Sequence, residues 1–306
     1  MSNEYNKDRL IRYPVLSGIY YPEDPETLEE LIRSFESGED ADGSGGTGGE
    51  RPGVPWGKQR TGGISDGFSP HSREKARAVI APHGAWAHCG GAAAAAFRAC
   101  RGRNPLRVVL LGVLHGGGRR GILLSNSDSF ETPLGRIPVD ARTGEELSSC
   151  STIIEIDDAP HLREHSLEVL LPFVKYYFPD AAIVPILMGF PSRNRIRALA
   201  GALRVVFQDR SGSTLFVISS CLSNAPAETE ARKQAELFLR LLAEGDLPAL
   251  KNGIFNGGIS ACGAAPAAAL LESGLMEGYG PRFLQNEAGA IPHDAGCVCY
   301  GSVAYG

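Results

Sequence analysis

The sequence predicts an α/β fold in which helices cover both faces of a mostly parallel central sheet. Short, continuous apolar runs alternate with amphipathic or alanine-rich stretches along most of the chain. A run that is apolar at every position is expected for a strand buried on both faces, and alternation of strands with helices is typical of parallel sheets. The length of 306 residues suits one large domain as well as two ordinary ones.

The first elements precede a change in composition at residue 38. Residues 13–35 are predicted to form a short extended piece and then a helix, with Pro25 near the first turn, where its missing N–H costs nothing. Residues 38–75 are rich in glycine and cannot bury enough apolar surface to offset their ordering entropy. We interpret them as a disordered insertion, with a lid over a site as the alternative.

The remainder of the chain is predicted to alternate between strands and helices. Strands are predicted at residues 78–81, 108–113, 182–188, 214–219 and 296–305. Helices are predicted at residues 88–100, 164–178 and 264–272. Together these elements supply the sheet and its two helical layers.

Charge, hydropathy and cysteine usage narrow the classes of function. The formal net charge is −5 and no Lys/Arg-rich run is present, which argues against nucleic acid and anionic membranes as partners. The polar N-terminus does not resemble a secretory signal, and no apolar stretch is long enough to span a membrane. Seven scattered cysteines without C-x-x-C spacing favour a reducing, cytoplasmic location over a disulfide framework.

Residues that can bind a metal follow three of the predicted strands. His83, His115 and Cys221 each come two residues after a strand, and ligands bind beyond the carboxyl ends of strands in open α/β sheets. Cys262 precedes a predicted helix, whose dipole lowers a thiol pKa. Imidazole and thiolate together suit zinc, iron or copper. For each residue alone, the alternative is a hydrogen-bonded loop histidine or a small buried cysteine.

A series of motifs runs from about Arg12 to the end of the chain, outside the glycine-rich insertion. They are Arg12-x-Pro14 with Gly18-x-Tyr20-Tyr21-Pro22, IAPHGAWAHCGG, LLGVLH, TPLGRIPVD, EHSLEVLLPF, PILMG, VISSCLSN and ACG. Their order and spacing resemble the Memo family, the AmmeMemoRadiSam system protein B group, and TPLG with EHSLEVLLPF is a specific combination. The resemblance implies one Memo-like domain over residues 1–306, similar in fold to the class III extradiol ring-cleavage dioxygenases.

The resemblance also implies a metal-capable pocket. The two histidines of the family fall on His83 and His115, and its cysteine falls on Cys262. Ring-cleaving relatives bind Fe(II) with two histidines and a carboxylate, and Cys262 occupies the place of that carboxylate. A thiolate there favours softer metals, and Memo proteins are linked to copper and iron.

One motif departs from the family pattern. Where the family usually has Ser-Ser-Asp-x-Ser-His, this chain has Ser-Ser-Cys221-Leu-Ser-Asn224. Asn224 stands where the dioxygenase relatives have their base and cannot take up a proton, so we expect weak or no ring cleavage. Cys221 would complete a tetrahedral His2Cys2 set with His83, His115 and Cys262, which suits Zn(II) or Cu(I). The alternative is a decayed site in which Cys221 only packs.

Three further residues are candidates for the wall of the pocket. Trp86 and His88 stand where the family commonly has tyrosines. His88 either faces the pocket or starts a helix and faces outward. His165 either orients a ligand or fixes its own loop through hydrogen bonds.

Three functions are compatible with these residues. The first is metal binding with weak or no ring cleavage, and the second is a metal-dependent (Fe or Cu) oxidoreductase of the extradiol type. The third is a non-catalytic peptide- or partner-binding module, for which the resemblance implies an AMMECR-type protein and a radical SAM protein as partners. Whether the protein is an enzyme is left open at this point.

Overall fold

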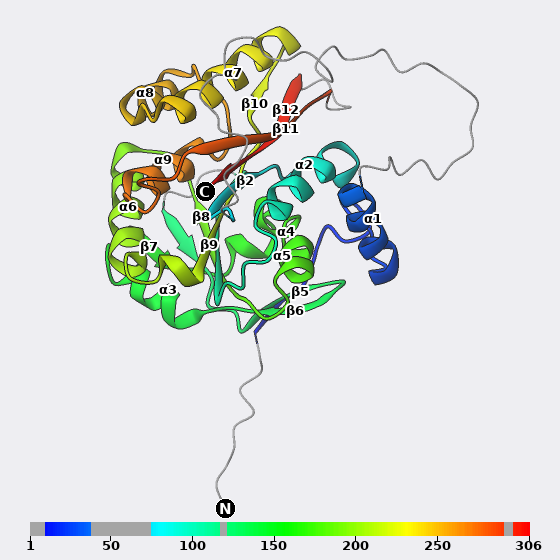
Figure 1. Ribbon diagram of the computed structural model, residues 1–306. Helices are drawn as coiled ribbons and strands as arrows, with labels where there is room; N and C mark the ends of the chain where they lie inside the picture. The colour runs from blue at the N-terminus through cyan, green and yellow to red at the C-terminus, as the bar shows by residue number, and fades with distance from the viewer. Residues whose placement is uncertain (1–9, 38–74, 117–120, 291–295) are drawn as a thin grey trace, which may run out of the picture.

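The computed structural model describes residues 10–37, 75–116, 121–290 and 296–306, and one large mixed sheet runs through them. Its strands follow one another in the order β10 (Ser223–Ala225), β12 (Cys297–Tyr305), β2 (Ala78–Ala81), β9 (Thr214–Ser219), β3 (Arg107–Val113), β8 (Ala182–Met188), β4 (Ile122–Leu124) and β7 (Ile154–Ile156). A further strand, β11 (Pro281–Ala290), pairs with β12 outside that path. Helices lie on both sides of this sheet (Figure 1), and the predicted α/β class is confirmed.

The four central strands of the sheet are parallel, whereas its flanks combine antiparallel pairs with one parallel pair, β4 with β7. β2, β9, β3 and β8 are neighbours that all run parallel. Strand β12 pairs antiparallel with both β2 and β11, and β4 pairs antiparallel with β8. Only residues 291–296 separate β11 from β12, which suffices for an antiparallel partner but not for a parallel crossover. The expectation of a mostly parallel sheet therefore holds for the four central strands and for the β4–β7 pair, and the whole sheet is mixed.

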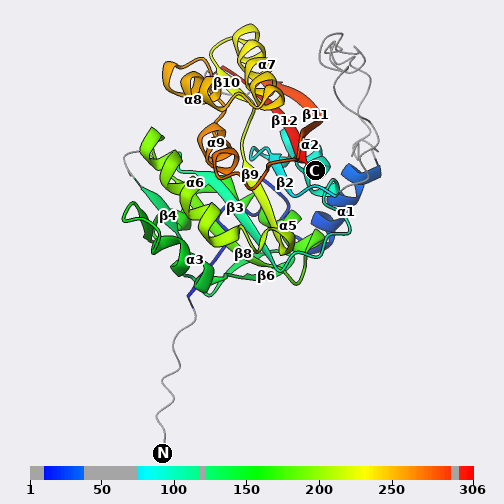
Figure 2. The ribbon, with the colours of Figure 1, turned by 60° about the vertical axis from the view of Figure 1, so that its left-hand side comes forward.

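The central strands divide the interior into two cores, because alternate side chains point to opposite faces. Val109 and Leu111 of β3 enter the core beneath α3 (Ala141–Ser148), α6 (Arg193–Phe207) and α9 (Ala264–Glu272). Val108 and Leu110 enter the core beneath α1 (Pro25–Ser37), α2 (Trp86–Arg98), α4 (His165–Glu168) and α5 (Leu171–Tyr177). Figure 2 shows α3 and α6 on one side of the sheet, and α1 and α5 on the other.

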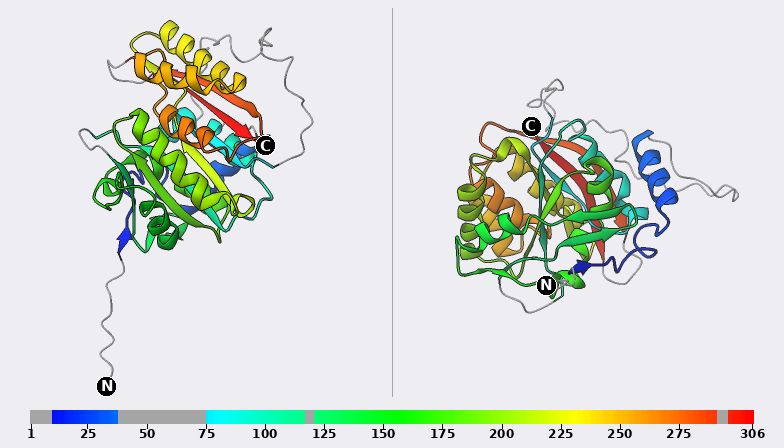
Figure 3. Two further views of the ribbon diagram at one scale, coloured as in Figure 1. Left: turned by 90° about the vertical axis from the view of Figure 1, so that its left-hand side faces the viewer. Right: turned by 90° about the horizontal axis from the view of Figure 1, so that it is seen from below.

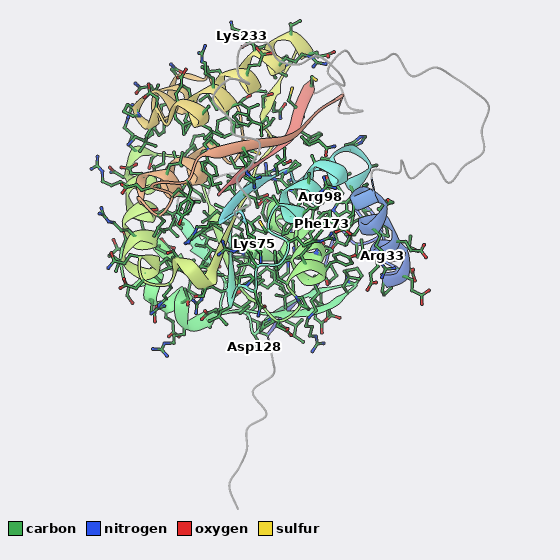
Figure 4. The ribbon with its side chains drawn as sticks, viewed as in Figure 1. Arg33, Lys75, Arg98, Asp128, Phe173 and Lys233 are labelled. Atoms are coloured by element: carbon green, nitrogen blue, oxygen red, sulfur yellow. The ribbon has the colours of Figure 1, made fainter. Side chains whose placement is uncertain are left out.

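Two helices extend the first core beyond the central strands. α7 (Glu228–Glu244) and α8 (Leu247–Asn256) pack over the end of the sheet that carries β10 and β12, as the left-hand view of Figure 3 shows. On the opposite side, α1 buries Leu28 and Ile32 completely and keeps Arg33 on its outer face, whereas Phe173 lies in the interior (Figure 4). The amphipathic pattern of the sequence thus predicts which side of α1 is buried.

A small three-stranded sheet lies beside the second core. β5 (Ser129–Thr132) pairs with β1 (Ile11–Arg12) and with β6 (Gly135–Pro138). The TPLG motif forms the turn between β5 and β6. There the Thr132 hydroxyl donates to the carbonyl of Gly135, at a distance of 2.8 Å.

The predicted helix over residues 164–178 is two helices in the structure, α4 and α5. Pro172 lies in the first turn of α5 and has no N–H to donate to the carbonyl of Glu168, so a continuous helix cannot pass this point. In contrast, β8, β9 and α9 begin and end where the sequence predicts. Strand β12 is buried along its whole length, although apolar and small or polar residues alternate over part of its sequence.

A buried ion pair holds α4 against the start of the chain. A guanidinium nitrogen of Arg12 lies 2.6 Å from Oε2 of Glu168, and both side chains are 1 % exposed. The other carboxylate oxygen of Glu168 accepts hydrogen bonds from the backbone N–H groups of Val15 and Leu16 and from the hydroxyl of Tyr21. These contacts fix the helix on which His165 lies.

Some expectations concern residues outside this description. The predicted insertion over 38–75 lies outside the described residues except for Lys75. Among the helices of the described ranges, none combines the length and the apolar character that crossing a membrane would require. None of the seven cysteines, all of which lie in the described ranges, forms a disulfide.

Candidate metal site

The carboxyl ends of three neighbouring parallel strands form one edge of the sheet. β2, β9 and β3 lie side by side there, and they are followed by His83, Cys221 and His115. Parallel strands must end on the same side, so residues that are distant in the sequence come together. The expected location of the site at this edge agrees with this topology.

Three imidazoles form a cluster at this edge. The ligand atoms of His83, His115 and His165 all lie within 4.8 Å of one another. The rings of His115 and His165 are stacked with centroids 4.4 Å apart, and the ring of His83 meets both edge-on at 5.1 and 5.5 Å. His83 is buried, whereas the side chain of His115 is 37 % exposed, so the cluster is open to solvent on one side. This arrangement can hold a metal ion.

Glu164 hydrogen-bonds the ring of His115 and lies close to the ring of His165. Its Oε1 atom lies 2.9 Å from Nδ1 of His115 and 3.2 Å from Nδ1 of His165, and its Oε2 atom accepts the backbone N–H of His115 at 2.7 Å. Oε1 also accepts the N–H of Ser166 and so caps α4. With both Nδ1 atoms turned to this carboxylate, Nε2 of each ring is the nitrogen left to bind an ion. A carboxylate behind a ligating imidazole is the usual second layer of a metal site.

The pKa values of Glu164, His115 and His165 are shifted in different directions. Burial opposes ionisation of Glu164, but hydrogen bonds from His115 and Ser166 outweigh it and lower its pKa to about 2. Burial likewise disfavours a charged His115, but hydrogen bonds to Cys262 and Glu164 raise its pKa to about 9. Burial and the neighbouring imidazoles lower the pKa of His165 to about 4. In the metal-free pocket His165 is therefore neutral and available as a donor to a metal.

A serine fixes the tautomer of His83. Nδ1 of His83 lies 2.7 Å from the hydroxyl of Ser219, the last residue of β9. That hydroxyl donates to the carbonyl of Ser166, so it accepts from Nδ1 of the imidazole. Nε2 lies 3.4 Å from the sulfur of Cys262; it carries the lone pair when the ring is neutral and a proton directed at that sulfur when the ring is charged.

Cys262 comes close to the end of β9 because the next residue has no side chain. A Cβ on Gly263 would lie 2.6 Å from the carbonyl oxygen of Ser219 and 2.5 Å from Cβ of Ser220. The sulfur of Cys262 accepts the backbone N–H of Cys221 at 3.1 Å, and the two sulfurs are 3.0 Å apart.

The two thiols differ in acidity. Burial opposes ionisation of Cys262, but a hydrogen bond from Cys221 and the imidazoles of His83 and His115 hold its pKa well below the ordinary value. Donation to Cys262, together with burial, raises the pKa of Cys221. Cys262 is thus the more acidic of the two thiols.

These donors fit a transition-metal ion, with one restriction. Two thiolates on one tetrahedral zinc ion lie about 3.8 Å apart, given Zn–S bonds of about 2.3 Å. The sulfurs of Cys221 and Cys262 are closer than this, so the His2Cys2 set would require them to separate. Cys262 with the histidines needs no such change in the sulfur–sulfur distance, and His165 is a histidine that the predicted ligand set did not include.

The other predicted pocket residues, Trp86, His88 and Asn224, do not belong to this cluster of histidines. Trp86 is buried, donates its indole N–H to the carbonyl of Val169 at 2.9 Å and stacks on Phe173. His88 lies in the first turn of α2 and is exposed. Asn224 is exposed in β10, where its backbone N–H donates to Ser260. Helix α2 begins at Trp86, so the side chains of residues 86 and 88 leave it in different directions.

Sequence reasoning missed three residues that shape the site. The roles of Glu164 and Ser219 follow from contacts between distant segments, although both residues belong to the quoted motifs EHSLEVLLPF and VISSCLSN. Tyr300 lies on β12 and belongs to none of the quoted motifs. It packs against Cys89 and Cys221 with its hydroxyl beside Gly84, and burial raises its pKa.

Comparison with known proteins adds a family relationship. The family model described as Memo-like protein matches residues 59–294. A MEMO1 family protein of Aeropyrum pernix is 35 % identical over 276 residues, which cover 90 % of this chain and 91 % of the relative. A MEMO1 family protein of Desulfurococcus amylolyticus is 31 % identical over 85 % of this chain and 86 % of its own length. A third, of Nitrosopumilus maritimus, is 26 % identical over 86 % of each chain.

Proposed function

Because this chain belongs to the Memo-like protein family, we propose that it binds a transition-metal ion and has weak or no ring-cleavage activity. The ion would be held by His83, His115 and Cys262, with His165 as a further donor. The observation that carries this proposal is the cluster of three imidazoles whose ligand atoms lie within 4.8 Å of one another. Imidazole nitrogen and thiolate sulfur favour borderline or soft ions, namely zinc, copper or iron.

The hydrogen bonds behind the donors support this proposal. Ser219 engages Nδ1 of His83, and Glu164 engages Nδ1 of His115 and lies close to Nδ1 of His165. Each imidazole thus turns Nε2 away from its partner, and the ordering cost of the site is met before an ion arrives. Such a preorganised set of donors is expected where binding, rather than packing, is the role of the residues.

Weak ring cleavage follows from the absence of a base at Asn224. An amide side chain cannot take up a proton at physiological pH, and Asn224 is exposed on β10. When bound, an ion would supply a Lewis acid and a point of attachment for an oxygen ligand. Without a base at position 224, removal of a proton from a bound catechol would be slow.

Metal analysis of the purified protein tests the proposal. We expect about one zinc or copper ion per chain on titration, by the one-site stoichiometry of such centres. The variants His115→Ala and Cys262→Ser should lose most of this binding, whereas His88→Ala, which changes an exposed histidine outside the cluster, should retain it. Equal metal content in all four proteins would show that the proposed site is wrong.

A second candidate function is a metal-dependent oxidoreductase of the extradiol type. It is favoured by His165, whose pKa is lowered to about 4 and which is therefore a neutral imidazole beside the pocket. His165 could accept a proton where Asn224 cannot. Oxygen uptake by the iron-loaded protein with a panel of catechols tests it, and an absence of uptake by the wild-type protein would exclude it.

Partnership with an AMMECR-type and a radical SAM protein stays a prediction from the family resemblance. Co-purification from a host that expresses all three proteins tests it. Retention of the partner by metal-free protein would favour an interaction module over a metal-dependent role.

A further inference from the structure

Cys221 and Cys262 place their sulfurs 3.0 Å apart at the edge of the proposed metal site. A disulfide bond is about 2.05 Å long, so the sulfurs need to approach by about 1 Å to form one. Co-ligation of one tetrahedral ion requires a separation of about 3.8 Å and therefore the opposite movement. The observed distance is thus compatible with oxidation of the pair at least as readily as with shared coordination.

We propose that Cys221 and Cys262 form a reversible disulfide, and that this disulfide excludes Cys262 from the metal site. The oxidant would be a low-molecular-weight disulfide such as oxidised glutathione. The two cysteines together lose two electrons and two protons and gain one S–S bond, while the S–S bond of the reagent breaks and yields two small thiols. Excess small thiol reverses the exchange.

The environments of the two sulfurs assign the order of the steps. Cys262 is partly exposed, and its sulfur accepts the backbone N–H of Cys221 and faces Nε2 of His83. It lies just before α9, a nine-residue helix whose N-terminus favours negative charge. These contacts make the sulfur of Cys262 the one that attacks the reagent and forms the mixed disulfide. Cys221 is buried, and its sulfur then displaces the small thiol.

The local backbone holds both cysteines in place for this exchange. Cys221 follows the last residue of β9 by two positions, and Cys262 is 41 residues away in the sequence. The backbone N–H of Gly263 donates to the hydroxyl of Ser220 at 2.8 Å, next to the hydrogen bond from Cys221 to the sulfur of Cys262. These two contacts join the segments on both sides of the sulfurs, so the pair does not depend on a chance encounter of two loops.

Disulfide formation and metal binding compete for the same atom. A sulfur within a disulfide carries no thiolate charge and is a poor ligand, so the oxidised chain would retain only the imidazoles. This second half of the inference rests on the proposed metal site. The first half does not, since it rests on the 3.0 Å separation of the two sulfurs alone.

The first experiment measures the disulfide in the metal-free full-length chain. After treatment with oxidised glutathione, we expect the intact mass to fall by two hydrogen atoms and two of the seven thiols to resist alkylation under denaturing conditions. Peptide mapping of the wild-type protein should join Cys221 to Cys262, a result that does not depend on the folding of any variant. Cys221→Ala should instead retain a glutathione adduct on Cys262, because no second thiol displaces it.

Two control variants test whether the disulfide is specific to Cys221 and Cys262. Cys150→Ser removes an exposed thiol, and Cys89→Ala removes a buried thiol that packs in the same cluster as Cys221. Both should form the disulfide as the wild-type protein does. A wild-type protein that acquires glutathione on exposed Cys150 but no internal disulfide overturns the proposal.

A second experiment uses zinc alone as the probe and separates the two claims. We expect the oxidised protein to bind zinc at least about tenfold more weakly than the reduced protein, and added thiol should restore the affinity. If the disulfide forms and zinc binds equally to both forms, the competition is refuted. If the reduced protein binds no zinc although the disulfide forms, the proposed metal site fails and the dithiol pair stands.

Discussion

Replacing Glu164 with glutamine tests whether one buried carboxylate orients two imidazoles of the metal site. The carboxylate receives the backbone N–H of His115 and lies within 3.2 Å of Nδ1 of both His115 and His165. Glutamine keeps the size of the side chain and one acceptor oxygen. It removes the negative charge and replaces the second oxygen with a donor, which cannot accept an N–H.

The expected loss of affinity follows from the position of this carboxylate. Removing a group that orients a ligating imidazole costs about 10–100-fold in metal affinity, which corresponds to about 1.4–2.8 kcal/mol. We expect the upper part of this range, because Glu164 is 3 % exposed and water cannot take its place. The pKa of His115 should also fall from about 9, since burial lowers that pKa and the hydrogen bond and charge of Glu164 counteract it.

Two measurements check this prediction. Zinc affinity is measured by competition with a chromophoric chelator, and the pKa of His115 by NMR titration of the metal-free protein. Glu155→Gln, a change at an exposed carboxylate on β7, is the matched control and should alter neither quantity. Thermal unfolding of each variant separates a local effect from misfolding. If Glu164→Gln binds zinc as the wild-type protein does and His115 titrates unchanged, the orienting role is refuted.

Three further predictions concern stability. Glu168→Ala leaves the buried guanidinium of Arg12 without its partner and should lower the free energy of unfolding in urea by about 3–5 kcal/mol. Glu29→Ala, in an exposed ion pair, should lower it by at most about 1 kcal/mol. Similar losses in the two variants would contradict the burial argument. Because the folded pKa of His115 is raised to about 9, its contribution to the stability of the metal-free protein is complete below about pH 6.5 and is lost as pH rises through about 9. The free energy of unfolding of the wild-type protein should therefore fall across that pH range, whereas that of His115→Ala should not show this fall. Gly263→Ala places a methyl group 2.6 Å from a backbone oxygen and should lower the free energy of unfolding by about 1–3 kcal/mol in thermal or urea unfolding. Gly201→Ala, where nothing lies within 4 Å, should stabilise α6 by about 0.5–1 kcal/mol. A Gly263→Ala variant as stable as the wild-type protein would contradict the close approach of Cys262 to β9.

The strands and helices with one strong local signal were predictable. β8 and β9 are continuous apolar runs, and α9 is an alanine-rich stretch that follows a glycine, so their ends coincide with the predicted ones. The break between α4 and α5 was missed because the apolar periodicity continues across it while Pro172 removes a hydrogen bond. Likewise, β12 is buried on both sides by β11, β2 and the helices around them, which no local pattern discloses.

For the site, the sequence showed which residues could bind a metal but not which of them lie next to one another. A histidine or cysteine two residues after an apolar run indicates which strand ends to consider, and His83, His115 and Cys221 were found in that way. Trp86 was expected at the pocket, and the structure shows it buried and stacked on Phe173.

The amino-acid sequence alone determined the α/β class, the family and the strand ends at which the chemistry lies, because these depend on local periodicity and on motifs. Only the tertiary structure decided that His165 joins the imidazole cluster, that Glu164 lies within 3.2 Å of Nδ1 of two rings, and that the sulfurs of Cys221 and Cys262 lie 3.0 Å apart. The physical reason is that these contacts join segments that are far apart in the chain. Their distances are set by strand order and by the close approach at Gly263, which no spacing along the sequence encodes.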